Sequence, residues 1–239
     1  MPQHFTNRVI LVTGGTGALG TVVTRLLLAR GAQVVVTYIK KDELDHLSAT
    51  LSEAERTRLT PFHADVTNPK AVKELVDHVI NQFHRVDGLA NLVGGYAHGA
   101  VTEITGDQWT AMLNLNLTST WLMTQAVLPT MRQANYGRIV AVGARGALDA
   151  QPRAAHYNVS KVGAMWLMTS VAHEYSAQNI TANSVLPSTI DTPANRQAMP
   201  TADVTHWVRP DEVAELICYL LAEESSGTSG AQIPVYGKA

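Results

Sequence analysis

The order of sequence patterns in the first forty residues constrains the fold more than any other feature of the chain. Residues 8–13 are a short apolar, β-branched run that predicts a strand, and a glycine turn follows it. Residues 21–30 then predict a helix ending at Gly31, and residues 33–38 predict a second strand. A helix between two such strands forms a right-handed crossover and makes the strands parallel. We therefore expect a parallel sheet.

The same alternation continues to the end of the chain without an internal repeat or a linker. Further strands are predicted over residues 58–64, 88–93, 138–142, 180–186 and 231–236, and helices over 42–57, 69–84 and 105–134, around 157–161 and from 209. Pro129 is expected to kink or interrupt the helix over 105–134. Residues 187–208 show no period and are long enough for a lid. The pattern predicts an α/β fold: a single Rossmann-type doubly wound domain over residues 1–239, with a seven-stranded, mainly parallel sheet flanked by helices on both faces.

Composition and charge exclude several classes of function. The chain has 239 residues, 46% of them hydrophobic and 16% charged, which is ample for a packed core. Its net charge of -2 leaves no basic surplus for nucleic acid or an anionic membrane, and no apolar run is long enough to span a bilayer. A single cysteine, Cys218, and nine scattered histidines give no metal-ligand spacing. We expect a cytoplasmic protein that acts on a small molecule and holds no metal.

The glycine turn after the first strand predicts a phosphate-binding loop. Backbone N–H groups and the positive end of the following helix can hold a pyrophosphate at such a turn. The residues expected to contact a dinucleotide there are Gly14, Thr16, Gly17, Ala18, Leu19 and Gly20. The alternative is an ordinary glycine turn, but its place at the first strand–helix junction favours dinucleotide binding.

The end of the second strand indicates which dinucleotide binds. An acidic residue there would accept the 2′-hydroxyl of NAD, and residues 36–41, which include Tyr38, contain no acid. Lys40 and Lys41 could instead meet a 2′-phosphate, or they could form a solvated basic turn. This pattern favours NADP(H) over NAD(H).

Tyr157 and Lys161 stand four residues apart at the head of a predicted helix and so share one helical face. A lysine charge about 4 Å from the phenol would favour phenolate by at most about 4 kcal/mol. Tyr157 is therefore expected to have a lowered pKa and to exchange a proton near neutral pH. The alternative is an unrelated tyrosine and lysine on a surface helix.

Together with the glycine loop, this pair makes the chain resemble the short-chain dehydrogenase/reductase family along its whole length. His63-Ala64-Asp65-Val66 resembles the stretch in which the family's aspartate contacts adenine, and Asn116 resembles its helical asparagine, which holds a water for proton relay. The resemblance implies that Lys161 grips the nicotinamide ribose. It also extends the expected cofactor contacts to Val66, Gly94, Pro187, Thr189 and Thr192.

Departures from the family pattern point to a subgroup. The family's catalytic serine normally lies about thirteen residues before the tyrosine, and Ala144 occupies that position. Dihydropteridine reductases share this alanine, use tyrosine and lysine, and reduce a quinonoid dihydropterin with NADH. The chain is similar to them over residues 14–20, 94–96, 143–149, 186–196 and 199–203. The missing acid after the second strand departs from their NADH pattern.

The resemblance implies an NAD(P)H-dependent reductase that acts by hydride transfer with a Tyr157/Lys161 proton relay. Its substrate would be a conjugated quinonoid or imine, pterin-like compound, or a carbonyl compound. The substrate pocket is expected to include Tyr96, His98, Ala144, Arg145 and His156. The alternative is a cofactor-sensing regulatory protein with little or no catalytic activity, as the lost serine could suggest.

The resemblance also implies a homodimer or homotetramer. The family commonly pairs its long helix and its tyrosine-bearing helix across a two-fold axis. The apolar residues that could lie there, or equally in the core, are Met112, Leu122, Met165, Trp166 and Met168.

Overall fold

The seven strands of the chain form one parallel sheet in the order β3-β2-β1-β4-β5-β6-β7. The structure is a computed structural model and describes residues 5–238. The strands are β1 (Val9–Thr13), β2 (Gln33–Tyr38), β3 (Leu59–His63), β4 (Gly88–Asn91), β5 (Gly137–Val142), β6 (Ile180–Pro187) and β7 (Gln232–Val235). The predicted fold class, a seven-stranded Rossmann-type sheet, is confirmed.

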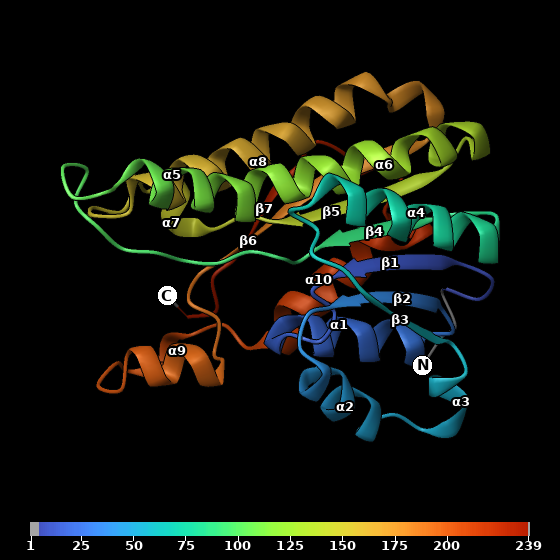
Figure 1. Cartoon of the computed structure of the whole chain (residues 1–239), viewed down its shortest axis with the longest axis horizontal. Coiled ribbons are helices and arrows are strands. Elements are labelled where there is room, and N and C mark those ends of the chain that lie inside the picture. Colours follow the sequence, from blue (N-terminus) through green and yellow to red (C-terminus); the bar gives the residue numbers. More distant parts are fainter. Residues whose placement is uncertain (1–4, 239) are drawn as a thin grey trace.

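Helices cover both faces of this sheet (Figure 1). One apolar core lies between the sheet and α1 and α10, and a second lies between the sheet and α4, α6 and α8. The helices are α1 (Ala18–Ala29), α2 (Lys41–Ala49), α3 (Glu53–Arg56), α4 (Pro69–Phe83), α5 (Gly106–Leu113), α6 (Ser119–Ala134), α7 (Arg145–Leu148), α8 (Ala155–Glu174), α9 (Pro193–Ala198) and α10 (Pro210–Leu221). Because both faces are covered, central strands such as β1 are buried along their whole length and show no polar alternation.

The α4 helix shows how local sequence sets an element. The Asn68 side chain accepts a hydrogen bond from the Lys70 N–H, Pro69 occupies the first turn, and His84 ends the helix in the left-handed conformation. Its apolar stripe, which packs on the sheet, consists of Val72, Leu75, Val76 and Val79. These apolar residues recur every three or four positions in the sequence, which is the spacing that predicts an amphipathic helix.

The helix predicted over residues 42–57 is two helices, so that prediction is wrong in its extent. Ser52 lies between α2 and α3 and starts α3 with a capping box: its hydroxyl accepts the Glu55 N–H, and the Glu55 carboxylate accepts the Ser52 N–H at 2.8 Å. This reciprocal pair stabilises a new helix start and ends the earlier helix.

The helix predicted over residues 105–134 is helical from Gly106 to Ala134, and Pro129 does not interrupt it. A π-helical turn, Asn114–Thr118, separates α5 from α6, and α6 continues through Pro129 to Ala134. Such turns place one extra residue in a helix. Here the turn includes Asn116, which the sequence assigned to the active site.

The sheet order reverses at β1, which lies between β2 and β4. In open parallel sheets, ligands bind at the carboxyl ends of the strands beside such a reversal. The loops after β1, β4, β5 and β6 all leave from this edge, and α5, α7 and α9 lie at the same end of the molecule (Figure 1). Within the region predicted as a possible lid, Ile190 bridges to Val208, so residues 190–208 return on themselves and enclose α9.

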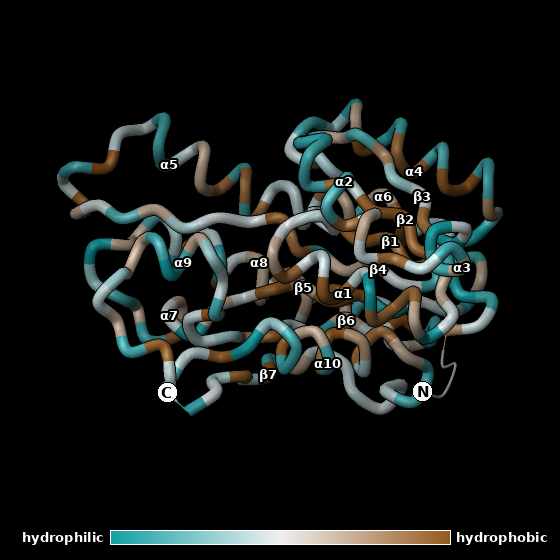
Figure 2. Tube along the Cα trace, turned by 90° about the horizontal axis from the view of Figure 1, so that it is seen from below, coloured by the Kyte–Doolittle hydropathy of each residue, from teal (hydrophilic) through white to brown (hydrophobic). Residues whose placement is uncertain are grey.

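The central strands consist mainly of apolar residues, and α2 and α3 consist mainly of hydrophilic ones (Figure 2). Of the five residues named for an oligomer interface, Met112, Leu122, Met165 and Met168 are core residues, and only Trp166 is exposed. The large apolar side chains that α5, α6 and α8 do expose are Trp109, Trp121, Val159 and Trp166.

No helix within residues 5–238 is long and apolar enough to cross a membrane. In the same residues, no group of three or more histidine, cysteine or acidic side chains could hold a metal ion.

Candidate functional site

The glycine loop folds tightly back on the start of α1. The Gly14 N–H donates to the Thr37 hydroxyl at 2.9 Å, which ties the loop to β2. A Cβ added at Gly20 would lie 2.0 Å from the Gly14 carbonyl oxygen, so only glycine permits this approach between loop and helix. This packing fixes the position of the helix N-terminus relative to the strand edge.

The N-terminus of α1 is open to an anion. Gly17 is the N-cap and offers no side-chain acceptor, and the first turn contains no acidic residue. The first N–H groups of a helix have no partner within it, and they carry the positive end of the helix dipole. These features fit a pyrophosphate, which Thr16, Gly17, Ala18 and Leu19 would hold.

At the end of β2 the structure places a carboxylate that the sequence argument missed. The Lys40 Nζ lies 3.4 Å from Glu43 Oε1, and the Thr16 hydroxyl donates to Glu43 Oε2 at 3.2 Å. Residues 36–41 contain no acid, but Glu43 reaches the phosphate loop from the first turn of α2. The sequence did contain a signal for this carboxylate, because Glu43 stands near the start of the helix predicted over residues 42–57.

The other residues predicted for the adenosine end lie at the ends of β2 and β3. The Tyr38 ring packs edge-on against the His63 ring, with 5.4 Å between centroids. Asp65 is exposed and accepts hydrogen bonds from the Thr67 N–H and hydroxyl, while Val66 is buried. Asp65 thus lies at the strand edge where adenine is expected.

Lys161 lies in the first half of α8 and is buried. Its Nζ donates to the Val142 carbonyl at 2.8 Å, and burial lowers its pKa to about 8. A Cβ added at Gly94 would lie 3.0 Å from this Nζ and 2.7 Å from Asn116 Oδ1. Because Gly94 has no side chain, the Lys161 ammonium group from α8 and the Asn116 amide from the π-helical turn can both lie against the loop after β4.

The pKa of Tyr157 is raised, not lowered as the sequence predicted. Burial is the larger cause and the neighbouring Tyr96 is the second, and together they bring this pKa to about 12. The Tyr96 ring packs edge-on against Tyr157, with 4.9 Å between centroids. Lys161 does not contribute to this shift, and its ammonium group donates to the Val142 carbonyl. At neutral pH the phenol keeps its proton and can donate it.

Asn116 joins the loop after β4 to α8. It accepts the Gly95 N–H at 2.9 Å and donates to the Gly95 carbonyl and the Ser160 hydroxyl, each at 3.0 Å. The hydrogen bonds of Asn116 do not include Lys161, so the predicted link between these two groups is not a direct contact. Both side chains lie instead against Gly94.

The position of the missing serine is apolar. Ala144 is buried in a small cluster with Met165 and Leu186, and Tyr157 packs against this cluster. The next residue, Arg145, pairs with Asp149 at 3.2 Å and lies 4.8 Å above the centre of the Tyr236 ring. The cluster on which Tyr157 packs therefore carries a methyl group at the position where the family usually has a hydroxyl.

Three further residues predicted to contact the cofactor follow β6. Pro187 is the last residue of that strand, and the Thr189 carbonyl accepts the Val208 N–H at 3.0 Å. The Thr192 hydroxyl accepts the Asn195 N–H at 3.2 Å and so caps α9. These contacts shape the segment that follows β6.

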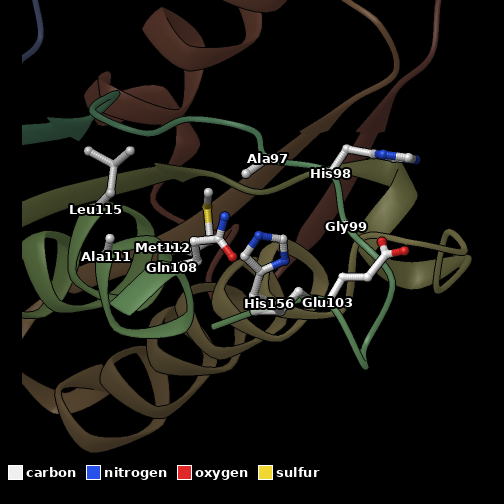
Figure 3. Close-up of a pocket in the computed structure, with 10 residues that line it drawn as sticks. Ala97, His98, Gly99, Glu103, Gln108, Ala111, Met112, Leu115 and His156 are labelled. Atoms are coloured by element: carbon white, nitrogen blue, oxygen red, sulfur yellow. The ribbon is translucent and has the colours of Figure 1, made fainter. Parts of the chain in front are cut away.

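His98 and His156 line a cavity that the other residues predicted for the substrate pocket do not line. Both line a cavity of about 310 Å³ together with Gln108, Met112 and other residues of α5 and the loop before it, and His98 points outward (Figure 3). Tyr157, Ala144 and Arg145 do not line this cavity. His156 is buried, and its Nδ1 has no hydrogen-bond partner among the described residues. The two histidines thus line a cavity beside Tyr157 that the tyrosine itself does not line.

Comparison with known proteins agrees with this geometry. A family model described as enoyl-(acyl carrier protein) reductase matches residues 15–237. The chain belongs to the short-chain dehydrogenase/reductase family. Members of this family use NAD(P)(H), so the chain is an oxidoreductase of that class. The specific similarity to dihydropteridine reductase is not shown by these comparisons.

Other members of the family match almost the whole length of the chain. The 3-oxoacyl-(acyl-carrier-protein) reductase FabG of Thermotoga maritima is 30% identical, with 96% of each chain covered. The 7alpha-hydroxysteroid dehydrogenase of Bacteroides fragilis is 29% identical, covering 98% of this chain and 95% of that one. A short-chain type dehydrogenase/reductase from Mycobacterium ulcerans has the same fold, with a TM-score of 0.91, 24% identity, and 98% of this chain and 90% of that one covered.

Proposed function

We propose that this protein is an NAD(P)H-dependent reductase of a conjugated quinonoid or imine compound, of which a dihydropterin is the model. The observation that carries the proposal is the pair of Tyr157 and Ala144: a protonated phenol packed against an apolar cluster that has an alanine where the family usually has its serine. We further propose that one domain over residues 1–239 carries both cofactor and substrate, and that the protein is a homodimer or homotetramer.

A bound nicotinamide supplies the hydride in this chemistry. The phosphate loop would hold the pyrophosphate, and Lys161 would hold the nicotinamide ribose. Tyr157 then donates its proton to the substrate atom that gains negative charge. Lys161 and Asn116 lie together against Gly94, and Asn116 positions the loop that follows β4. A proton from water restores the phenol.

The apolar environment of Ala144 supports the substrate class. In ketone reduction, a donor to the developing oxyanion is worth about 3–4 kcal/mol of transition-state stabilisation. A quinonoid or imine substrate carries its developing charge on nitrogen or spreads it over a ring, so it needs that donor less. The relatives named above act, by their names, on oxoacyl and hydroxysteroid compounds, which makes a ketone the competing substrate class.

The proposed cofactor is NADP(H) in preference to NAD(H), on the basis of Lys40 and Lys41. The alternative of a cofactor-sensing regulator has no observation in its favour. A sensor has no need of a buried lysine and asparagine placed together against Gly94 beside a tyrosine.

Steady-state oxidation of NADPH and NADH by the purified protein tests this function. The substrate panel consists of a quinonoid dihydropterin, a cyclic imine, an aryl ketone and a 3-oxoacyl thioester. We expect turnover of the first two with a higher kcat/KM than of the last two. Turnover of the ketone or thioester alone would overturn the substrate class, and cofactor binding without any turnover would overturn the enzyme assignment.

A further inference from the structure

The cavity that His98 and His156 line has the size of a small-molecule site. It measures about 310 Å³, which is near the lower end of the range for ligand pockets. Its walls come from the loop over residues 97–104, from α5 and from the start of α8. The cavity is therefore lined by other residues than Tyr157, Lys161 and Ala144, to which the reduction is assigned.

Contacts between the walls hold the cavity in shape. The Gly99 N–H donates to the Arg153 carbonyl at 2.7 Å, and Glu103 pairs with the Arg153 guanidinium at 2.9 Å. These two contacts tie the loop to the chain that enters α8. On α5, Met112 is buried and its sulfur accepts a hydrogen bond from the Asn116 amide at 2.9 Å. The walls are thus pre-formed, as those of ligand pockets usually are.

His156 is the buried polar side chain of this cavity. It is 2% exposed, and its ring is directed toward the part of α5 that carries Gln108 and Met112 (Figure 3). Its Nδ1 has no hydrogen-bond partner, and no group within residues 5–238 hydrogen-bonds to its Nε2. Buried polar groups in folded proteins are nearly always hydrogen-bonded. The described part of the chain therefore leaves an unpaired imidazole in the wall of the cavity.

We propose that this cavity is a second binding site, for a small neutral molecule with an apolar ring or chain and one hydroxyl group. The hydroxyl pairs with the His156 imidazole, because it can both donate and accept and so fits either tautomer. The apolar body contacts Ile104, Met112 and Leu115. This inference goes beyond the proposed function and does not depend on it.

The charges around the cavity favour a neutral ligand. Among residues 5–238, Glu103 is the only acid that lines it, and no lysine or arginine does. The Glu103 carboxylate is already paired with Arg153 and also accepts the Ala100 N–H at 3.1 Å. An anion would lie beside this carboxylate, and a cation would have to take it from Arg153. A neutral molecule with a hydroxyl group meets neither cost.

The cavity adjoins the two tyrosines of the candidate active site. Ala97 lines it, and the preceding residue, Tyr96, packs edge-on against Tyr157. His156 lines it as well and directly precedes Tyr157 in α8. The experiment therefore has to distinguish a second site from an extension of the substrate pocket.

The experiment measures binding of phenol and of toluene, two probes of similar shape that differ in a hydroxyl and a methyl group. The full chain carries isotope labels on its methionine methyl groups and is titrated by NMR without cofactor or substrate. The Met112 signal, assigned with Met112→Leu, reports binding in the cavity. The ratio of the two dissociation constants isolates the contribution of the hydroxyl.

Three variants locate the interaction. His156→Leu removes the imidazole and keeps an apolar side chain, and Ala111→Phe adds a ring at the exposed rim of the cavity. His173→Gln, at an exposed histidine in the last turn of α8, is the control for loss of a histidine. Thermal unfolding of each variant shows whether it is folded.

We expect phenol to bind the parent, and His156→Leu to shift the ratio toward toluene by about fivefold, because one hydrogen bond is lost. His173→Gln should leave the ratio unchanged. Ala111→Phe should abolish the binding of both probes, and this keeps the inference testable if His156→Leu does not fold.

Four results would overturn the inference. The first is no shift of the Met112 signal in the parent, which would mean that water or a partner subunit fills the cavity. The second and third are an unchanged ratio in folded His156→Leu and unaffected binding in folded Ala111→Phe. The fourth is displacement of phenol by a quinonoid dihydropterin or an aryl ketone, which would make the cavity part of the substrate pocket. Absence of turnover together with the expected probe binding would contradict the proposed function instead.

Discussion

The two ends of the predicted cofactor site are built in opposite ways. At the nicotinamide end, Lys161 and Asn116 are buried and their polar atoms are held by backbone carbonyls, a backbone N–H and a buried hydroxyl. At the adenosine end, Lys40 and Glu43 are partly exposed and meet each other across one turn of chain. Buried groups are fixed by packing, and exposed ion pairs are individually weak. We therefore expect substitutions at the nicotinamide end to change the reaction rate strongly. Substitutions at the adenosine end should change the preference between NADPH and NADH only mildly.

The strongest test of the buried end is Tyr157→Phe. We expect kcat to fall about a hundredfold or more because the phenol no longer donates a proton, while the dissociation constant of the cofactor changes little. Stopped-flow measurement of hydride transfer and a binding titration check both parts. Tyr219→Phe, an exposed tyrosine on α10, is the control. A near-normal rate in Tyr157→Phe would mean that water or another group supplies the proton.

A second test uses the pH dependence of stability. Burial lowers the pKa of Lys161 to about 8 from an ordinary value of 10.5, so the folded protein binds this proton more weakly than the unfolded chain does. The free energy of unfolding should therefore rise as the pH increases from about 8 to about 10.5, by about 3 kcal/mol from this group. Below pH 8, where Lys161 is protonated in both the folded and the unfolded protein, the full free-energy cost of burying its charge is present.

Lys161→Met isolates that contribution. In urea unfolding, the variant should gain stability relative to the parent at pH 7, and this gain should shrink by about 3 kcal/mol near pH 10.5. A stability difference that is the same at both pH values would show that Lys161 is not desolvated in the folded protein.

Ala144→Ser sharpens the comparison by adding a polar group to the apolar side of the site. The new hydroxyl should raise kcat/KM for a ketone relative to a quinonoid dihydropterin by about tenfold, a part of what one oxyanion donor supplies. Parallel kinetics on the two substrates measure the ratio. If the parent already prefers the ketone by a wide margin, another group replaces the serine and the substrate proposal fails.

The smallest effect is expected at the exposed end. Lys40→Ala together with Lys41→Ala should raise the dissociation constant for NADPH about fivefold more than that for NADH, since exposed charge interactions are worth about 1 kcal/mol or less. Lys70→Ala with Lys73→Ala, two exposed lysines of α4, is the control for loss of charge alone. Equal effects on both cofactors would show that neither lysine contacts the 2′-phosphate.

The sequence predicted the features that depend on local order along the chain. The range of β2 was predicted without error, and the glycine loop, the shared face of Tyr157 and Lys161, and the parallel sheet follow from period and spacing. The capping box at Ser52 was present in the sequence but was not used.

Features that depend on where side chains end in space were missed. Glu43 reaches Thr16 across twenty-seven positions of sequence, and the raised pKa of Tyr157 depends on burial and on Tyr96 from another loop. Five residues were assigned to an interface or equally to the core, and four of them are core residues; a helix pattern alone does not say which of two apolar faces meets the sheet. Such placements require tertiary structure.

The π-helical turn at Asn114–Thr118 also sets the phase of the helix that follows it. Trp121 comes twelve positions after Trp109, which is about 3.3 turns of a regular α-helix and would rotate one tryptophan about a third of a turn away from the other. One residue taken up by the wide turn reduces this to about 3.1 turns, which puts the two positions on the same side of the helix, and both side chains are exposed. Deleting a single residue from the turn would restore a regular helix and withdraw the Asn116 side chain from Gly95, while the two tryptophans kept their alignment.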